Sequence, residues 1–425
     1  MHTLLFYEPG HFHAALCLRI SNSRVSEDVH LYARQGPELE AFLSLVQAFN
    51  QRADAPTRWR VHVHESSDLL AALIDERRGD AVILAGRNDG KLETIARLHE
   101  AGLPVLADKP WLTDASALPH LDTVTSGGPL AMDIMTGRYG ALARVRRLIV
   151  AREQLFGGFV TDHAEGFAIE IGSKHHLYKI VNGRPLRRPA WYYDVAVQGD
   201  GMVDIHSHMI DQVQWLVAGE VELDYERDFR LTTARRWQTP VPLDLYREST
   251  GEAAFPASVE DAVSDDVLAL SCNGAIEHAL LGVSARQHAE WSQREPEGGG
   301  DLQSNVVRGR RVSVQMRHGP ETGFAPELHV VPAPGEDVRV ELEAAVDDWQ
   351  EAFPGIGLEP SSIGFRLTWP AGLDGGHETH FALMLDEFLD YLDAGVWPAA
   401  LLPRIRSRYT LLARARELSL QGPNV

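Results

Sequence analysis

A stretch near the middle of the chain carries three ionisable side chains at helical spacing. It reads GDGMVDIHSHMIDQVQW and covers residues 199–215. On a helix, Asp204, His208 and Asp211 stand at i, i+4 and i+7 and therefore share one face. A carboxylate one turn away from an imidazole can orient it and keep it available as a general base. A solvent-facing polar stripe would show the same spacing, but three ionisable groups directly after a Gly-Asp-Gly turn favour the catalytic interpretation.

A lysine follows a short apolar run in VLADKPW, residues 105–111. Lys109 comes directly after a predicted buried strand, and Pro110 stops the strand and stiffens the turn. An ammonium at the carboxyl edge of a sheet can stabilise an alkoxide or carbonyl oxygen. A solvated loop lysine is the alternative, and it is the commoner case for any single lysine.

The first predicted strand runs into a turn and a predicted helix in LLFYEPGHFHAAL, residues 4–16. A dinucleotide-binding protein carries G-x-G-x-x-G at this place. Here the three glycine positions hold Glu8, Gly10 and His13. Gly10 can still allow the close backbone approach of a pyrophosphate, and Pro9 could shape the turn. Taken alone, the stretch favours an ordinary strand-to-helix loop.

Cations and aromatic rings gather between residues 175 and 191, which we expect to be a loop. The segment holds His175, His176, Tyr178, Lys179, Arg184, Arg187, Arg188 and Trp191. Such a mixture suits a polyhydroxylated or anionic ligand through forked hydrogen bonds and stacking. A neutralising surface loop or a subunit contact would have the same composition.

Near the end of the chain, HETHF places His377 and His380 at i, i+3. This spacing puts both imidazoles on one helical face, as a metal site could require. The sequence is not H-E-x-x-H, so we favour a polar helix start, with a substrate contact as second choice, and we predict no metal site. Arg138, in DIMTGRY, could reach the site from the domain junction.

The elements that must position these side chains alternate between strand and helix in the first third of the chain. Strands are predicted at residues 3–7, 29–33, 60–64, 81–85, 103–107 and 129–133, with helices at 37–50, 66–78 and 91–102. This alternation predicts a Rossmann-type, doubly wound parallel sheet. Ligands bind outside the carboxyl ends of such strands. The loop at Glu8, and Arg34, Asn88 and Lys109, all fall at those ends.

After about residue 147 the pattern changes to longer β-like runs, at 159–171, 269–287, 311–316 and 327–333. They indicate a large, mostly antiparallel sheet. Helices are predicted at 202–217, 377–395 and 401–420. We therefore expect an α/β protein with a nucleotide-binding domain at 1–140 and an α+β domain at 141–425. Its terminal helices, about 378–418, should pack back across both domains.

Composition narrows the class of protein further. The 425 residues carry a formal charge of −20, which speaks against nucleic acid and anionic membranes as partners. There is no apolar run of about 18 residues for a membrane span, and the N-terminus does not look like a signal peptide. Only Cys17 and Cys272 are present. A reducing, cytoplasmic location without structural disulfides is expected.

Several of these motifs together resemble the Gfo/Idh/MocA oxidoreductases. ADKP resembles the E-K-P signature of that family, and GDGMVDIHSHMIDQVQWL is similar to its G-G-G-x-x-x-D-x-G-x-H-x-x-D helix. Four further stretches resemble the subgroup that carries the putative oxidoreductase C-terminal domain: EPGHFHAAL, LAGRNDGK, HHLYKIVNGRPLRRPAWYYD and GHETHFALMLDEFLDYL. The resemblance covers nearly the whole chain.

The resemblance implies roles for particular residues. Lys109, Asp204 and His208 align with the family's catalytic lysine, its substrate-positioning aspartate and its histidine base. E-P-G-H-F-H is the usual first turn of the subgroup, so the expected cofactor contacts are Glu8, Gly10, His11, Phe12, Arg34, Asn88 and Lys109. The family keeps an acid for NAD where this chain has Arg34, which could instead accept a 2′-phosphate. NAD against NADP stays open.

The function that the resemblance implies is NAD(P)-dependent oxidation of a CH–OH group in a sugar, polyol or sugar derivative. The expected substrate contacts are Arg138, His176, Tyr178, Arg188, Trp191, Asp211 and His380. One alternative is glycoside cleavage by oxidation, elimination, hydration and reduction, with Tyr178, His176 or His380 as the second acid or base. Another is a ligand-sensing protein without catalysis. A homodimer or homotetramer is expected.

Overall fold

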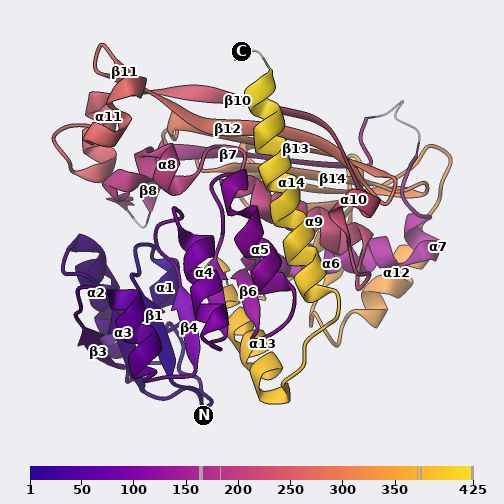
Figure 1. Ribbon diagram of the computed structural model, residues 1–425. Coiled ribbons are helices and arrows are strands. Elements are labelled where there is room, and N and C mark those ends of the chain that lie inside the picture. The colour runs from indigo at the N-terminus through magenta and orange to yellow at the C-terminus, as the bar shows by residue number, and fades with distance from the viewer. Residues whose placement is uncertain (162–165, 182, 371, 374–375, 423–425) are drawn as a thin grey trace.

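The computed structural model describes residues 1–161, 166–181, 183–370, 372–373 and 376–422 (Figure 1). Its first third is built on a six-stranded parallel sheet of order β3-β2-β1-β4-β5-β6. The strands are β1 (Leu4–Tyr7), β2 (Asp28–Tyr32), β3 (Arg60–His64), β4 (Ala81–Leu84), β5 (Val105–Asp108) and β6 (Ala131–Ile134). All six lie where the sequence predicts them, and the predicted Rossmann-type sheet is confirmed.

Helices connect these strands. They are α1 (His13–Leu16), α2 (Pro37–Gln51), α3 (Leu69–Glu76), α4 (Lys91–Glu100) and α5 (Leu118–Thr125). Helices α2, α3 and α4 lie where the apolar periodicity predicts them, whereas α5 was not predicted. Every residue of β4, β5 and β6 is buried, because crossover helices cover both faces of a parallel sheet. The strand order reverses between β1 and β4, so the crevice for a ligand opens beyond their carboxyl ends.

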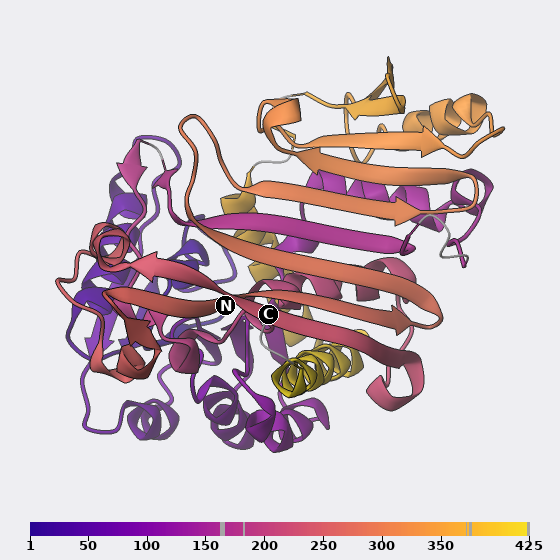
Figure 2. The same ribbon diagram turned by 90° about the horizontal axis from the view of Figure 1, so that it is seen from above.

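The rest of the chain forms a ten-stranded sheet, whose strands Figure 2 shows side by side. Its order is β10-β12-β13-β7-β14-β15-β16-β18-β17, with β11 paired to β12, and only β7 and β13 run parallel. The strands are β7 (Ile169–Tyr178), β10 (Phe229–Pro242), β11 (Val263–Ser264), β12 (Val267–Leu280), β13 (Val283–Arg294), β14 (Leu302–Arg308), β15 (Val312–His318), β16 (Glu327–Pro332), β17 (Gly357–Ser361) and β18 (Gly364–Thr368). The predicted large, mostly antiparallel sheet is confirmed.

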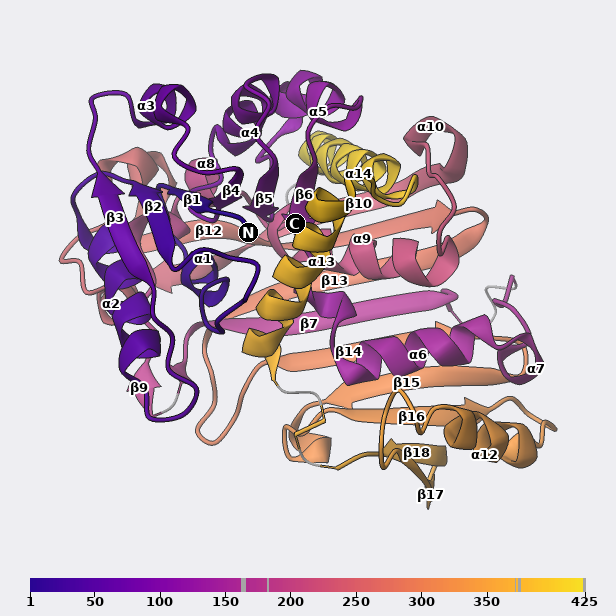
Figure 3. The ribbon, with the colours of Figure 1, turned by 90° about the horizontal axis from the view of Figure 1, so that it is seen from below.

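Helices α6 (Ala141–Ala151) and α9 (Asp204–Val217) lie across one face of this sheet (Figure 3). Smaller helices complete the second half: α7 (Glu153–Phe156), α8 (Val195–Gln198), α10 (Tyr225–Asp228), α11 (Leu243–Thr250) and α12 (Arg339–Asp348). Most of α9 is buried, including Asp204 and Asp211. The predicted helix therefore forms, but its polar stripe does not face solvent.

Of the two terminal helices, α14 (Leu401–Gln421) contacts both halves of the molecule, whereas the main contacts of α13 (His380–Ala394) are with the first domain. Helix α13 contacts α1 and β6, and α14 contacts α5 and β6 as well as α9 and β10. No described helix is both long and apolar enough to cross a membrane.

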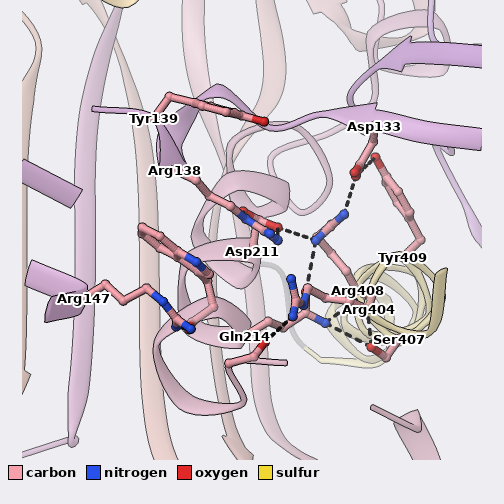
Figure 4. Close-up of polar contacts among 12 residues, drawn as sticks. Asp133, Arg138, Tyr139, Arg147, Asp211, Gln214, Arg404, Ser407, Arg408 and Tyr409 are labelled. Carbon is pink, nitrogen blue, oxygen red and sulfur yellow. Dashed lines mark hydrogen bonds and ion pairs between the residues drawn. The ribbon is translucent and has the colours of Figure 1, made fainter. Parts of the chain in front are cut away.

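A buried ion network holds α14 in this position (Figure 4). Arg408 is 1% exposed and donates hydrogen bonds to Asp133 on β6, to Asp211 on α9 (2.5 Å) and to Gln214 (3.0 Å). Arg138 donates through Nε to the same Asp211 carboxylate at 2.6 Å. Two guanidinium groups thus donate hydrogen bonds to the Asp211 carboxylate. The sequence predicts Arg138 and Asp211 as substrate contacts, but these bonds favour a role in joining the domains.

Two expectations about secondary structure are wrong. Residues 175–178 belong to β7 rather than to a loop, and β8 (Ile180–Val181) and β9 (Arg184–Pro185) form a short hairpin after it. The predicted run at 159–171 includes residues 162–165, which lie outside the described residues, and its strand begins only at Ile169. Pairing with β13, where His175 lies opposite Trp291 and Tyr178 opposite Arg294, keeps residues 175–178 in the sheet although the local composition resembles a loop.

Candidate active site

A chain of charged groups joins the parallel sheet to α9. Lys109 follows β5, and its Nζ donates a hydrogen bond of 2.6 Å to Oδ1 of Asp204, the first residue of α9. Both side chains are only 11% exposed. His208 lies one turn further along α9 and lines a cavity beside the large sheet. The structure therefore brings the three predicted catalytic residues to one place, from two domains.

The surroundings of these three groups shift their pKa values in different directions. Burial and the neighbouring Lys109 ammonium lower the pKa of His208 to about 3, so its imidazole is neutral near pH 7. Burial also lowers the pKa of Lys109, but the Asp204 and Asp108 carboxylates outweigh it and leave a raised pKa. The same ion pair outweighs burial at Asp204 and lowers its pKa. The site combines a neutral base, a fixed cation and a fixed anion.

The carboxylate of Asp108, beside Lys109, faces two imidazoles from the segment that follows β1. Its Oδ2 lies 2.9 Å from Nδ1 of His13 and 3.4 Å from Nδ1 of His11. The three residues place possible metal-ligand atoms within 4.8 Å of one another, the one such group in the described part of the chain. Burial lowers the pKa of His13 to about 3 despite Asp108. A His–Asp hydrogen bond explains this geometry without a metal, so we interpret the cluster as an anchor for the loop.

In the loop after β1, Glu8 stands where the expected motif has its first glycine, and its backbone is strained. Glu8 has φ 38°, in the left-handed region that glycine adopts freely and other residues rarely. The glycine that allows the tight approach stands elsewhere, after β4: a Cβ on Gly86 would lie 2.3 Å from the Glu8 carbonyl oxygen. Sequence reasoning did not identify Gly86. A glycine directly after a strand at the switch point was the available signal.

A groove of about 580 Å³ follows this loop across the carboxyl ends of β1, β2 and β4. Glu8, Gly10 and Arg34 line it. Nη1 of Arg34 lies 3.5 Å from Oε1 of Glu8, so a cation stands beside the carboxylate that would otherwise repel a pyrophosphate. Gly10 N and His11 N both donate to the Ala85 carbonyl at 3.1 Å, which fixes the loop against β4.

Asn88 lies beside this groove, but its side chain forms hydrogen bonds with other residues of the protein. Its Nδ2 donates to the Gln198 carbonyl (2.7 Å) and its Oδ1 accepts from Lys91 (2.5 Å). Asn88 is 4% exposed, which favours a role in bridging the domains over direct contact with a cofactor.

Lys91 was not recognised from the sequence. Burial lowers its pKa to about 8, and a lysine at the positive N-terminus of a helix is the unusual feature that could have drawn attention to it.

A second cavity, of about 490 Å³, continues along the other side of the loop. His11 and Phe12 line one wall, and Arg188 and Trp191 line the other. Trp191 lies over Gly10, since a Cβ on this glycine would be 3.5 Å from its ring, and its buried Nε1 has no hydrogen-bond partner among the described residues. Arg188 instead donates to the carbonyls of His176 (2.9 Å) and Leu177 (2.8 Å), so part of its guanidinium supports the backbone.

The cavity beside His208 has a volume of about 440 Å³ and lies between α6, α9 and the large sheet. His380 lines it, as does His175, which the sequence analysis did not select as a substrate contact. His176 is 3% exposed and faces Asp301 at 3.4 Å, while Tyr178 packs against Arg294. Of the three predicted second bases, His380 is therefore the one that lines this cavity. The side chain of His377 lies outside the described residues.

Buried imidazoles should make the fold sensitive to acid. Burial lowers the pKa of His206 to about 4, below the value of about 6.5 in an unfolded chain. The unfolded state therefore binds more protons between these values, and stability should fall as the pH drops through this window. We expect His206→Gln to flatten the pH dependence of the unfolding free energy by up to about 1.4 kcal/mol per pH unit.

Urea unfolding of both proteins at several pH values measures this effect. Above about pH 7.5 the imidazole is neutral in both states, so the two pH dependences should run parallel there and provide the internal control. Parallel curves below about pH 6 would contradict the assignment of a neutral, buried His206.

Comparison with known proteins shows that the protein is an oxidoreductase. Residues 145–420 match the family described as "Putative oxidoreductase C terminal domain". A putative oxidoreductase from Parabacteroides merdae ATCC 43184 is 33% identical, with a TM-score of 0.94 over 99% of this chain and 97% of that chain. The chain belongs to the Gfo/Idh/MocA-type oxidoreductases that carry this C-terminal domain.

More distant structures share the fold. Levoglucosan dehydrogenase, solved with NADH and L-sorbose, is 14% identical with a TM-score of 0.63 over 99% of this chain and 97% of that chain. A putative myo-inositol dehydrogenase from Sinorhizobium meliloti 1021 is 14% identical with a TM-score of 0.55, over 99% and 98%. No curated protein matches the sequence.

Proposed function

We propose that the protein oxidises a CH–OH group of a sugar, polyol or sugar derivative with NAD or NADP as hydride acceptor. The observation that carries the proposal is the geometry at the start of α9, where the Lys109 ammonium pairs with Asp204 at 2.6 Å and the His208 imidazole lies one turn further along the helix. Alcohol oxidation removes a proton from oxygen and a hydride from carbon. A neutral imidazole can accept the proton, and a neighbouring ammonium can stabilise the negative charge that develops on the oxygen.

The residues of the first domain fit a dinucleotide. The groove lies at the reversal of strand order, where doubly wound sheets bind such ligands, and Gly10 and Gly86 keep the loop close to the sheet. Arg34 provides a cation beside Glu8, and the unpartnered Nε1 of Trp191 offers a donor over Gly10. When bound, the nicotinamide supplies the hydride acceptor. NADH in levoglucosan dehydrogenase, which has the same fold, supports this assignment.

In the proposed reaction His208 accepts the hydroxyl proton of the substrate. Lys109 donates a hydrogen bond to the same oxygen as it becomes negative. Asp204 holds the Lys109 ammonium in position through the 2.6 Å hydrogen bond and keeps it charged. The cavity that His208 lines is large enough for a monosaccharide and has several polar side chains in its wall. This supports a sugar or polyol as the substrate class.

Cofactor binding is the direct test of the proposal. We expect NAD or NADP to raise the melting temperature, because a ligand at 100 times its dissociation constant stabilises a fold by about 2.7 kcal/mol. Arg34→Asp should favour NAD over NADP relative to the wild type, since an aspartate there can accept a ribose hydroxyl and repels a 2′-phosphate. Thermal shift with both dinucleotides measures the preference.

Arg58→Asp, at an exposed arginine outside the residues that line the groove, is the matched control and should keep the wild-type preference. If neither dinucleotide changes the melting temperature of the wild type, the proposed function is wrong.

A further inference from the structure

The cavity beside His208 contains a buried arginine without an acidic partner. Arg146, on α6, is 3% exposed and lines the cavity. Among the described residues no carboxylate lies within 4.0 Å of its guanidinium, whose Nη2 donates a hydrogen bond of 2.7 Å to Oε1 of Gln212. The buried Nε of Arg146 has no hydrogen-bond partner among the described residues. A buried, unpaired cation is costly unless a ligand or partner compensates its charge.

Burial is the cause of the unusual acidity of this guanidinium. It lowers the pKa of Arg146 to about 10, and no neighbouring carboxylate opposes the shift. Arg408 shows the contrast within the same molecule. It is buried as deeply, but Asp133 and Asp211 face it and its pKa is raised. Burial also lowers the pKa of Arg404, the third buried arginine of the described chain, to about 10, but Glu220 lies 3.9 Å from its guanidinium. Arg408 and Arg404 thus each face a carboxylate, whereas Arg146 faces none within 4.0 Å among the described residues.

The wall of the cavity is largely apolar, with Ile171, Met209 and Leu328 among its side chains, and its polar groups are basic or neutral. It contains Arg146, four histidines and several amides, and no Asp or Glu of the described chain lines it, in a protein of 60 acidic residues and net charge −20. The polar side chains come from elements that Figure 3 shows close together, with Arg146 on α6, Gln212 on α9 and Asn305 on β14. Oδ1 of Asn305 is buried and has no partner among the described residues, while its Nδ2 donates to Gln212 at 3.3 Å.

We infer that this cavity binds an acidic sugar and that Arg146 receives its carboxylate. The inference rests on the proposed function and narrows its substrate class from sugars and polyols to uronic or aldonic acids. A carboxylate carries one negative charge, which one guanidinium can neutralise, whereas a phosphate dianion would remain half uncompensated in a buried site. Arg146 would act in specificity, not in the chemical step.

The position of Gln212 agrees with this arrangement. It lies four residues after His208 on α9, so the two side chains share one face of the helix, about 6 Å apart along its axis. This separation is comparable to the width of a pyranose ring. A carboxylate held at Arg146 and Gln212 would therefore leave a hydroxyl on the far side of the ring beside His208.

Matched pairs of sugars test the inference. We would titrate D-glucuronate, D-galacturonate and D-mannuronate against D-glucose, D-galactose and D-mannose, and gluconate against glucitol, by calorimetry with and without the preferred dinucleotide. Glucose 6-phosphate tests whether a phosphate serves instead. At least one acid should bind more tightly than its neutral counterpart by about 10–150-fold, the range expected for hydrogen bonds to a charged group.

Two variants assign the effect to Arg146. Arg146→Met should lower the affinity for the acid by a similar factor and change the affinity for the neutral sugar little, while Arg146→Lys should retain part of the preference. Because Arg146→Met removes an unpaired buried charge, it should melt no lower than the wild type.

Failure of the inference can be separated from failure of the proposed function. No acid preference in any pair, or a phosphate preference, would overturn the inference even if dinucleotides bind and NADH is produced. A lower melting temperature of Arg146→Met with unchanged acid affinity would show a structural role and would also overturn it. Absence of any dinucleotide effect would overturn the proposed function, while the titrations without dinucleotide would still report the acid preference.

Discussion

Replacing Lys109 by methionine is expected to lower kcat by about 10²–10³-fold, because a preorganised donor to a developing oxyanion contributes this much. Methionine keeps most of the length of the side chain and removes the ammonium that pairs with Asp204. Initial rates of NADH formation, with the sugar that the calorimetric titrations identify as the tightest ligand, measure the effect. The thermal shift caused by the dinucleotide should stay close to that of the wild type.

Lys174→Met is the matched control for this experiment. Lys174 lies on β7 and pairs with Glu290 at 3.0 Å, in a position where its side chain is 38% exposed. An exposed ion pair contributes little, so both turnover and melting temperature should change little. Near-full turnover by Lys109→Met would remove the ammonium from the mechanism.

Replacing Arg408 by methionine is expected to lower the free energy of unfolding by about 3–5 kcal/mol, the usual effect of removing one partner of a buried ion pair. Both Asp133 and Asp211 lose a charged donor, although Arg138 still faces Asp211. Urea unfolding near neutral pH measures the loss. Because the network joins α14 to β6 and α9, the two halves should also lose cooperativity, which would appear as a broader or two-step transition.

Arg406→Met is the control on the same helix. Its guanidinium is 56% exposed and pairs with Asp122 at 2.7 Å, so a change below about 1 kcal/mol is expected. Arg408→Met combined with Asp133→Asn and Asp211→Asn should recover part of the stability, because the uncompensated carboxylates are then removed as well. Equal stability losses for Arg408→Met and Arg406→Met would contradict a stabilising role for the network.

Local sequence predicted those parts of the fold that depend on local pattern. The six strands of the parallel sheet are continuous apolar runs separated by amphipathic helices, and this pattern is enough to identify them. Strand β10 was not predicted, because it lies at the edge of the large sheet and exposes arginines along RLTTARRWQ. Local composition predicts a loop at residues 175–178, because the pairing that makes them a strand comes from β13, more than 100 residues later in the chain.

In the candidate site, too, residue types and spacing were predictable, whereas contacts between distant parts of the chain were not. Lys109, Asp204 and His208 could be selected by residue type, spacing and resemblance, and the structure brings them together. What Asp211 faces could not be inferred, because its partner Arg408 is 197 residues away in the sequence. Arg146 offered a signal that was not used. It lies beside Val145 and one turn before Ile149 on the buried face of α6, where a charged residue is unusual.

The position of Arg408 in α14 has a consequence for synthesis. Helix α14 follows every other described element in the chain, whereas Asp133 and Asp211 belong to elements made long before it. A growing chain can therefore form the parallel sheet and much of the large sheet while both carboxylates still lack this guanidinium. Ribosome-bound chains that end before α14 should hold their two halves only loosely, and the joint between them should close when the last helix has emerged.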